Sequence, residues 1–173
     1  MLGSKLKEAL ICFKNLRVTL SYPAQPAPPA EGFRGRLEID IDKCIGCGAC
    51  AIACPPRLIN IVDLDTKRTF EFALGKCTYC ARCAEICPEQ AITMSREFEL
   101  ATENKSDLNI TMELTMVKCQ ECGTAFTTQR IRDKLMAVLP EKIEIEPAAL
   151  DWLKLCPDCR RLQEVHKLTE AGT

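Results

Sequence analysis

The sequence predicts an α+β fold in three parts, and three observations support this prediction. A helical repeat of apolar residues opens the chain, two copies of one cysteine spacing fill its middle, and two Cys-x-x-Cys pairs lie in its last third. We therefore expect an N-terminal helix with a proline-rich strap over residues 1–32, a cysteine-rich domain over 33–104, and a second cysteine-bearing domain over 105–173.

The composition is that of a folded protein and narrows the possible functions. Of the 173 residues, 47% are apolar, and 23 basic side chains balance 24 acidic ones to a formal charge of −1. This balance argues against nucleic acid as a partner. The sequence has no apolar run of about eighteen residues that could span a membrane. It also lacks a glycine-rich phosphate loop, a G-x-S-x-G elbow and an H-E-x-x-H pair, so we expect no catalytic centre of its own.

The middle of the chain contains the spacing Cys-x-x-Cys-x-x-Cys-x-x-x-Cys-Pro twice. This run is the ligand set of a bacterial-type ferredoxin with two [4Fe-4S] clusters, in which the fourth cysteine of each run ligates the other cluster. The first cluster is therefore assigned to Cys44, Cys47, Cys50 and Cys87, and the second to Cys54, Cys77, Cys80 and Cys83. Clusters of this kind transfer single electrons.

Disulfides or zinc explain these cysteines poorly, because neither needs a third cysteine at the same interval followed by Cys-Pro. Gly46 and Gly48 allow the first loop to wrap a cluster closely and to direct amide N–H groups at its sulfurs. The second loop has no such glycines, and its residues there are Thr78, Tyr79, Ala81 and Arg82. We expect the two clusters to differ in electrostatic surroundings and in reduction potential.

Residues 2–20 are expected to form a basic amphipathic helix. Its apolar residues recur at helical spacing, and they are Leu2, Leu6, Ala9, Leu10, Phe13 and Leu16. Such a helix suits either a membrane interface or the surface of a neighbouring protein, and the pattern favours neither. Cys12 is interpreted as part of its apolar face rather than as a reactive thiol. Four prolines within residues 22–29 keep the following strap extended.

Each half of the middle domain is expected to give a cysteine loop, a short helix and an apolar strand. The strands are placed at residues 58–62 and 91–94, after an alternating segment at 37–41. The 22 residues between Cys54 and Cys77 leave room for an added hairpin, which we expect to contact a neighbouring subunit. A polar segment after this domain places the next boundary near residue 105.

The last third contains a second type of cysteine site. Two Cys-x-x-Cys pairs can place four sulfurs tetrahedrally around one ion, and they are Cys119, Cys122, Cys156 and Cys159. Zinc is favoured over a rubredoxin-like iron, because most four-thiolate sites without a redox partner motif are structural. The 33 residues between the pairs exceed the usual zinc-ribbon gap and contain a helical pattern that we expect to end at Pro140. The region is predicted to be a zinc-ribbon-like domain with a helical insertion, and His166 a surface residue of its C-terminal helix.

The additions to a ferredoxin core indicate a fixed subunit rather than a diffusing carrier. The first hypothesis is an electron-relay subunit of a membrane-associated oxidoreductase, because an anchoring helix accompanies two clusters. The second is a regulatory or scaffolding protein that senses redox state through its clusters. Two clusters with crossed ligands form a short conduction path, which favours the relay.

Several segments also resemble a known family: Ser21-Tyr-Pro, Phe33-Arg-Gly, Cys44-Ile-Gly-Cys, both Cys-Pro pairs, Ser95-Arg-Glu-Phe-Glu-Leu-Ala, and the C-terminal cysteine pairs. They are similar to the two-cluster ferredoxin-like iron–sulfur subunit of group 4 membrane-bound [NiFe] hydrogenases, as in formate hydrogenlyase, which is related to chain I of respiratory complex I. The resemblance covers almost the whole chain. Its most discriminating feature is the C-terminal cysteine site, which complex I chain I generally lacks.

This resemblance implies a set of partners. Electrons are expected to pass between a donor and the hydrogenase small subunit. The donor is a formate dehydrogenase, a carbon monoxide dehydrogenase or a ferredoxin. The [NiFe] site of the large subunit is expected to reduce protons. The first helix is expected to lie on the cytoplasmic face of the membrane against membrane-arm subunits, which makes the protein peripheral. The alternative is a chain I-type relay subunit of a complex I-like NADH/quinone or ferredoxin oxidoreductase.

Overall fold

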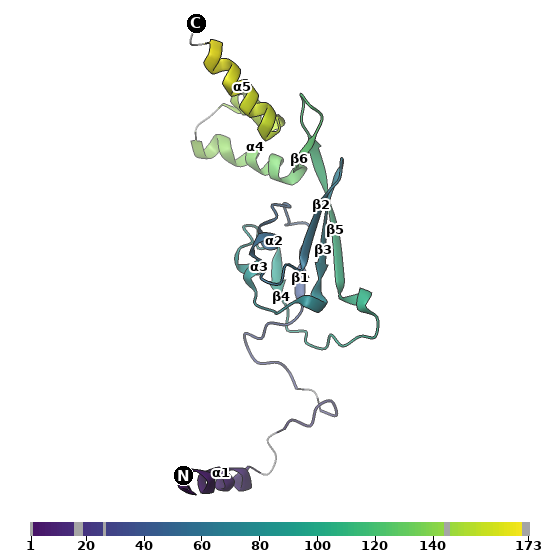
Figure 1. Ribbon diagram of the computed structural model, residues 1–173, viewed down its shortest axis with the longest axis vertical. Coiled ribbons are helices and arrows are strands. Elements are labelled where there is room, and N and C mark those ends of the chain that lie inside the picture. Colours follow the sequence, from purple (N-terminus) through teal and green to yellow (C-terminus); the bar gives the residue numbers. More distant parts are fainter. Residues whose placement is uncertain (1, 16–18, 26, 144–145, 171–173) are drawn as a thin grey trace. The chain divides into compact units, whose positions relative to one another are not determined.

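The computed structural model describes residues 2–15, 19–25, 27–143 and 146–170 (Figure 1). The chain divides into two compact units, Met1–Phe33 and Arg34–Thr173. The boundary expected near residue 105 falls inside the second unit, where the segments before and after it share one sheet.

The first unit contains helix α1 (Leu2–Lys14). The helix is shorter than the predicted span of 2–20. The backbone N–H and the side-chain Nδ2 of Asn15, the residue after its end, both donate to Ile11 O at 3.1 Å. Residues 16–18 of the predicted span lie outside the described residues. None of the helices in the described ranges combines the length and apolar character needed to cross a membrane.

The second unit contains the remaining elements and two sheets. In chain order they are β1 (Leu37–Ile39), α2 (Ala49–Ala53), β2 (Ile59–Asp63), β3 (Lys67–Ala73), α3 (Arg82–Glu85), β4 (Ile92–Met94), β5 (Asn109–Lys118), β6 (Ala125–Thr128), α4 (Gln129–Ile143) and α5 (Pro157–Glu170). Turns of 3₁₀ helix occur at Leu74–Lys76, Lys105–Leu108 and Pro147–Lys154. The α+β class predicted from the sequence is confirmed.

The two strands predicted after the cysteine loops exist, but they belong to different sheets. β4 pairs with β1 in an antiparallel two-stranded sheet, whereas β2 pairs with β3 in the added hairpin. β3 then pairs along its whole length with β5, and β5 pairs with β6, to give the order β2-β3-β5-β6. One edge of the hairpin is therefore occupied by a later strand of the same chain, a use that the sequence did not predict.

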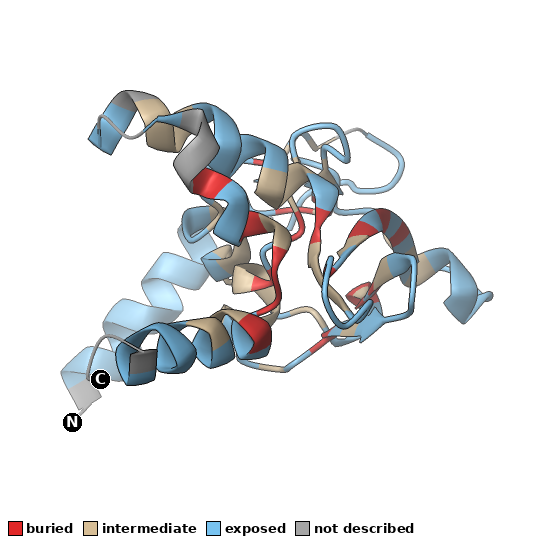
Figure 2. Ribbon diagram, turned by 90° about the horizontal axis from the view of Figure 1, so that it is seen from above, coloured by how far each residue is buried: buried red, intermediate tan, exposed pale blue. Residues whose placement is uncertain are grey.

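The main core lies between the four-stranded sheet and the cysteine loops. Phe70 and Phe72 project from β3, each only 1% exposed, and Met112 and Leu114 of β5 join them on the same face. Figure 2 shows the buried residues gathered in the interior of this unit, while α1 is exposed along its described length. Four of the motif cysteines pack directly on this core, so the loops that carry them rest on a rigid base.

The helix predicted between the C-terminal cysteine pairs is present as α4, with one correction. Pro140 lies inside the helix, which continues to Ile143 instead of ending at the proline. A proline in the last turn removes a single N–H donor, and only three residues of helix follow it. Beyond α4, Leu150 and Leu153 of the 3₁₀ segment are buried, and α5 begins at Pro157.

Candidate iron–sulfur and metal sites

The first candidate site is a small cavity lined by Cys44, Cys47, Cys50 and Cys87. Cys44 and Cys47 come from the loop that leads into α2, Cys50 lies in the first turn of α2, and Cys87 comes from the segment after α3. Phe70 and Phe72 close the cavity on the sheet side. The structure thus brings together the four residues that the sequence assigned to the first cluster, including the remote Cys87.

The second cavity is lined by Cys54, Cys77, Cys80 and Cys83. Its remote member, Cys54, follows α2, which begins just before Cys50 of the first cavity. Each cavity is thus lined by three cysteines of one motif and the last cysteine of the other. This grouping is compatible with the crossed ligation expected from the doubled motif.

The two loops share one backbone conformation despite their different residues. Left-handed φ values occur at Gly46 (+77°) and Gly48 (+79°), and again at Tyr79 (+52°) and Ala81 (+64°), which lie 33 positions later. Burial raises the pKa of the Cys44 thiol, and the hydrogen bond from the amide of Gly46 offsets part of that rise. In the second loop the amide of Tyr79 donates to Cys77 Sγ at 3.4 Å. The second loop adopts the same turn without glycine, so glycine is not needed for the turn itself.

Packing explains why the first loop has glycine. A Cβ atom on Gly46 would lie 2.6 Å from Leu114 Cδ1 and 2.8 Å from Thr128 Cγ2, so the sheet leaves no room for a side chain. At the equivalent place in the second loop, Tyr79 carries a full phenol ring. The first loop is therefore packed against β5 and the end of β6.

We expect Gly46→Ala to destabilise the protein strongly. The left-handed backbone costs about 1–2 kcal/mol for an alanine, and overpacking adds about 1–3 kcal/mol. The measurement is the thermal unfolding midpoint of the iron-loaded protein. Gly48→Ala is the matched control, because its φ is nearly the same but its nearest neighbour is the end of the Ile61 side chain at 3.3 Å. Equal effects of the two substitutions would contradict the close packing at Gly46.

Burial makes bare thiolates unfavourable in both cavities. It raises the pKa of Cys50 to about 12 and that of Cys83 to about 11, and it also raises the pKa of Cys44. A cation bound to the sulfurs reverses this preference, because a metal deprotonates the thiol that coordinates it. Backbone amides assist: Ala91 N–H donates to Cys87 Sγ at 3.2 Å. Four cysteines that line one cavity, with amide donors to their sulfurs, fit an iron–sulfur cluster.

The C-terminal cysteines form a tighter site. Their four sulfurs all lie within 4.8 Å of one another, and they belong to Cys119, Cys122, Cys156 and Cys159. The separation of 3.6 Å between the sulfurs of Cys122 and Cys156 is near the ~3.8 Å that a tetrahedral zinc site with Zn–S bonds of ~2.3 Å requires. Among the described residues, no other group of three or more metal-ligating side chains is this close. The eight motif cysteines are thus spread more widely than ligands of one ion.

Local structure places these four sulfurs. The first pair lies in the turn between β5 and β6, where Cys119 N–H donates to Thr124 O at 2.9 Å, and the second pair begins α5. Backbone amides of Cys122 and Cys156 lower the pKa of Cys119 to about 6, whereas the neighbouring thiol of Cys156 raises that of Cys159. Amide donors directed at Cys119 favour its charged form, which suits a site that binds a cation.

Known proteins share this chain's motifs. Residues 37–94 match the family described as the 4Fe-4S dicluster domain. Formate hydrogenlyase subunit 6 of Escherichia coli (strain K12) is 38% identical over 146 residues, which cover 83% of this chain and 81% of the relative. The chain belongs to the family of formate hydrogenlyase subunit 6. The resemblance recognised in the sequence is thereby confirmed.

The chain is also similar to proteins with other names. NAD(P)H-quinone oxidoreductase subunit I from the chloroplast of Marchantia polymorpha is 45% identical over 102 residues, and the chain spans 55% of its length. Among solved structures, a chain of the membrane-bound sulfane sulfur reductase, an archaeal respiratory membrane complex, is 30% identical, with a TM-score of 0.46 and coverage of 57% of this chain and 56% of that chain. The match to formate hydrogenlyase subunit 6 extends over more of the chain than the match to subunit I.

The sequence did not reveal the residues of this subunit 6 family member that support the first cysteine loop from outside. Arg68 of β3 donates to Gly46 O at 2.8 Å and holds Asp63 with two further bonds of 2.6 and 2.7 Å. Thr128 donates to Ile45 O at 2.5 Å. These contacts join residues far apart in the chain, and no local pattern marks an arginine or a threonine for such a role.

Proposed function

We propose that this protein is the electron-relay subunit of a membrane-associated hydrogenase of the formate hydrogenlyase type. In this proposal, electrons pass through two [4Fe-4S] clusters between a donor dehydrogenase or ferredoxin and the hydrogenase small subunit. One observation carries it: each of two neighbouring cavities is lined by four cysteines drawn from both halves of the doubled motif. Clusters held in this way stand close together, as a relay requires.

The chain's own residues perform simple tasks in this function. Bound [4Fe-4S] clusters supply one-electron redox chemistry. The cysteines fix the two stations, because Cys50 and Cys54 lie one helical turn apart and line different cavities. The aromatic and aliphatic side chains of the core line the first cavity and exclude water from it, which helps to set the potential. Amides of Ala91 and Tyr79 donate to cysteine sulfurs and favour their charged form.

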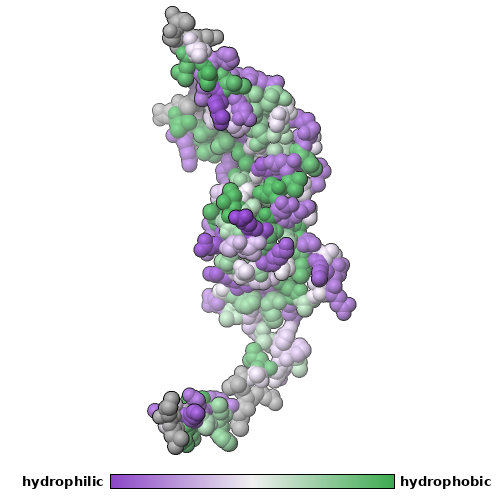
Figure 3. Space-filling model, viewed as in Figure 1, coloured by the Kyte–Doolittle hydropathy of each residue, from purple (hydrophilic) through white to green (hydrophobic). Residues whose placement is uncertain are grey.

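The N-terminal helix supports attachment to a larger assembly. In α1 the apolar side chains of Leu6, Leu10 and Phe13 are exposed, with Phe13 at 82%. Lysines accompany them, and Figure 3 shows hydrophobic and hydrophilic surface together on this helix. We infer that α1 lies on the cytoplasmic face of the membrane or against a membrane-arm subunit, so the protein is peripheral.

Purification of the native complex tests this proposal. A tag on the chain is expected to co-purify the large and small hydrogenase subunits from membranes under anaerobic conditions. Hydrogen gas is then expected to reduce two clusters per copy of this chain, as followed by electron paramagnetic resonance. A chain that purifies without hydrogenase subunits, or that holds fewer than two clusters, would contradict it.

The related alternative is a relay subunit of a complex I-like oxidoreductase. The 45% identity to subunit I over 102 residues favours it, but that relationship covers only 54% of this chain. The same purification separates the two functions, since a complex I-like assembly would bring down quinone-module subunits and its clusters would not be reduced by hydrogen.

A further inference from the structure

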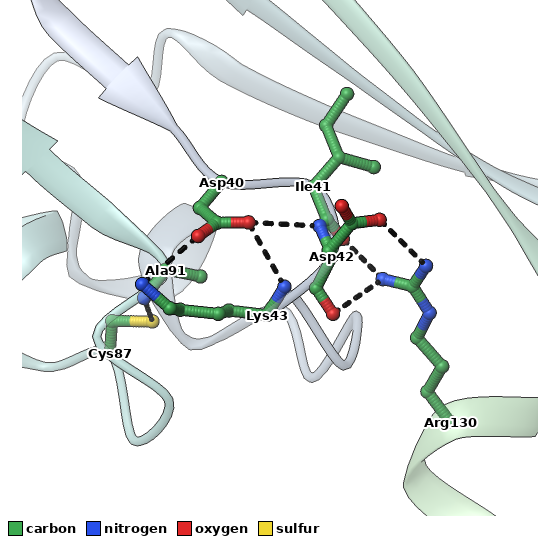
Figure 4. Close-up of polar contacts among 7 residues, drawn as sticks. All are labelled: Asp40, Ile41, Asp42, Lys43, Cys87, Ala91 and Arg130. Carbon is green, nitrogen blue, oxygen red and sulfur yellow. Dashed lines mark hydrogen bonds and ion pairs between the residues drawn. The ribbon is translucent and has the colours of Figure 1, made fainter.

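Helix α4 makes direct contacts with the first cysteine loop (Figure 4). Arg130, in the first turn of α4, points its guanidinium at the backbone between β1 and α2. Its Nη1 donates to the carbonyl oxygens of Ile41, Asp42 and Cys44, the last at 2.9 Å, and its Nη2 lies 3.9 Å from the Asp42 carboxylate. One side chain therefore binds three carbonyl groups of the segment that leads into the first ligand, Cys44.

The next turn of the same helix reaches the other part of the first cavity. Lys134, four residues after Arg130, forms an ion pair with Glu89, which lines the cavity two residues after Cys87. Residues four apart lie on one face of a helix. This face of α4 thus bridges the two separate chain segments that supply the first ligand set.

The start of α4 is itself tied to the loop. Thr128, fully buried at 0% exposure, donates from Oγ1 to Ile45 O and accepts from Ile131 N–H at 3.3 Å, so the same hydroxyl caps α4 and holds the loop. β6, which ends at Thr128, begins just after the turn that carries Cys119 and Cys122. Contacts therefore run without a break from the C-terminal cysteine site to the first cysteine loop.

We propose that α4 is a brace for the first cluster, in which Arg130 and Lys134 act as positioning residues that hold Cys44 and Cys87 on opposite sides of the cavity. The brace does not extend to the second loop, where Tyr79 occupies the position at which the first loop meets Thr128. The first cluster then depends on the C-terminal region for its retention, and the second cluster does not. This inference rests on the proposal that both cavities hold clusters, but not on which complex the protein serves.

Iron release from the full-length holoprotein tests the brace. Arg130→Gln and Lys134→Gln are expected to accelerate loss of the first cluster to a ferrous chelator by about tenfold, as when outer contacts of metal ligands are removed. The second cluster should be released at the wild-type rate. Electron paramagnetic resonance follows the two clusters separately, and signals are assigned with Cys87→Ser and Cys54→Ser reference proteins.

Two further variants separate positioning from general stability. Arg132→Gln is the matched control, because Arg132 lies on the same helix but pairs with its neighbour Asp133 at 2.7 Å. It should leave both release rates unchanged. Arg130→Lys keeps the charge but loses the planar fork that places Nη1 on the carbonyls and Nη2 near the Asp42 carboxylate, so it should release the first cluster as fast as Arg130→Gln does.

The reduction potential gives a second readout. Loss of the positive charge in Arg130→Gln should lower the reduction potential of the first cluster alone. At a fixed ambient potential the ratio of oxidised to reduced first cluster should therefore rise, and a tenfold rise in this ratio corresponds to a shift of about 59 mV. Arg130→Lys should restore most of this ratio. Equal acceleration of both clusters, or of neither, would overturn the brace. Wild-type protein that holds fewer than two clusters would overturn the proposed function instead.

Discussion

Cys87→Ser is expected to remove or damage the cluster bound by the first loop, although Cys87 belongs to the second motif. The reason is that Cys87 lines the cavity of Cys44, Cys47 and Cys50. Iron should fall from about eight to about four atoms per chain, and one of two paramagnetic signals should change. Iron analysis and electron paramagnetic resonance of anaerobically reconstituted protein measure both quantities.

The corresponding substitution in the first motif, Cys54→Ser, tests the same crossed arrangement from the other side. Cys54→Ser should alter the other signal, because Cys54 lines the second cavity. Cys12→Ser is the control, since Cys12 is an exposed cysteine of α1 outside both cavities, and it should leave both signals intact. If Cys87→Ser and Cys83→Ser affected the same cluster, the crossed arrangement would be wrong.

Removal of the ion expected at the C-terminal cysteines should unfold the surrounding region. The buried core there consists of Cys119, Leu155, Cys156 and Cys159, with Phe126 packed beside it. With three of four core residues also ligands, little apolar packing remains without the metal. A structural zinc ion contributes about 10–16 kcal/mol in small zinc-binding peptides, so a loss of several kcal/mol is expected here. Hydrogen exchange followed by mass spectrometry should show lost protection in β6 and α5 after chelation or in Cys156→Ser.

Elemental analysis of the same preparations identifies the metal, with zinc expected over iron. His166→Ala is the control substitution, because His166 is exposed on α5 and lies away from the four sulfurs. It should keep the exchange pattern of the wild type. Protection of β6 and α5 that survives complete metal removal would refute a structural role for the site.

The positions of the candidate ligands follow from spacing alone. The doubled motif specifies two loops of fixed length, so counting residues is enough to place Cys44 and Cys77 in corresponding turns. The helix α4 is likewise predictable from its apolar period. Both features depend on residues that are close together in the chain, so they can be recognised in the sequence alone.

The long-range contacts could not be predicted in the same way. β3 pairs with β5 through backbone hydrogen bonds, which nearly every residue type can form. The residues of β3 therefore do not indicate which strand it pairs with. Arg130 likewise meets its carbonyl partners only after the sheet has brought α4 to the loop. Such features depend on the assembled fold.

The unequal packing of the two cysteine loops determines which side chains each loop can accept. The two copies of the motif have the same spacing, yet only position 46 packs closely against Leu114 and Thr128, while position 79 carries a tyrosine. A larger side chain at position 46 would therefore collide with β5 and the end of β6, whereas position 79 already carries a phenol ring. The two copies of the motif consequently tolerate different side chains at the same point of the turn.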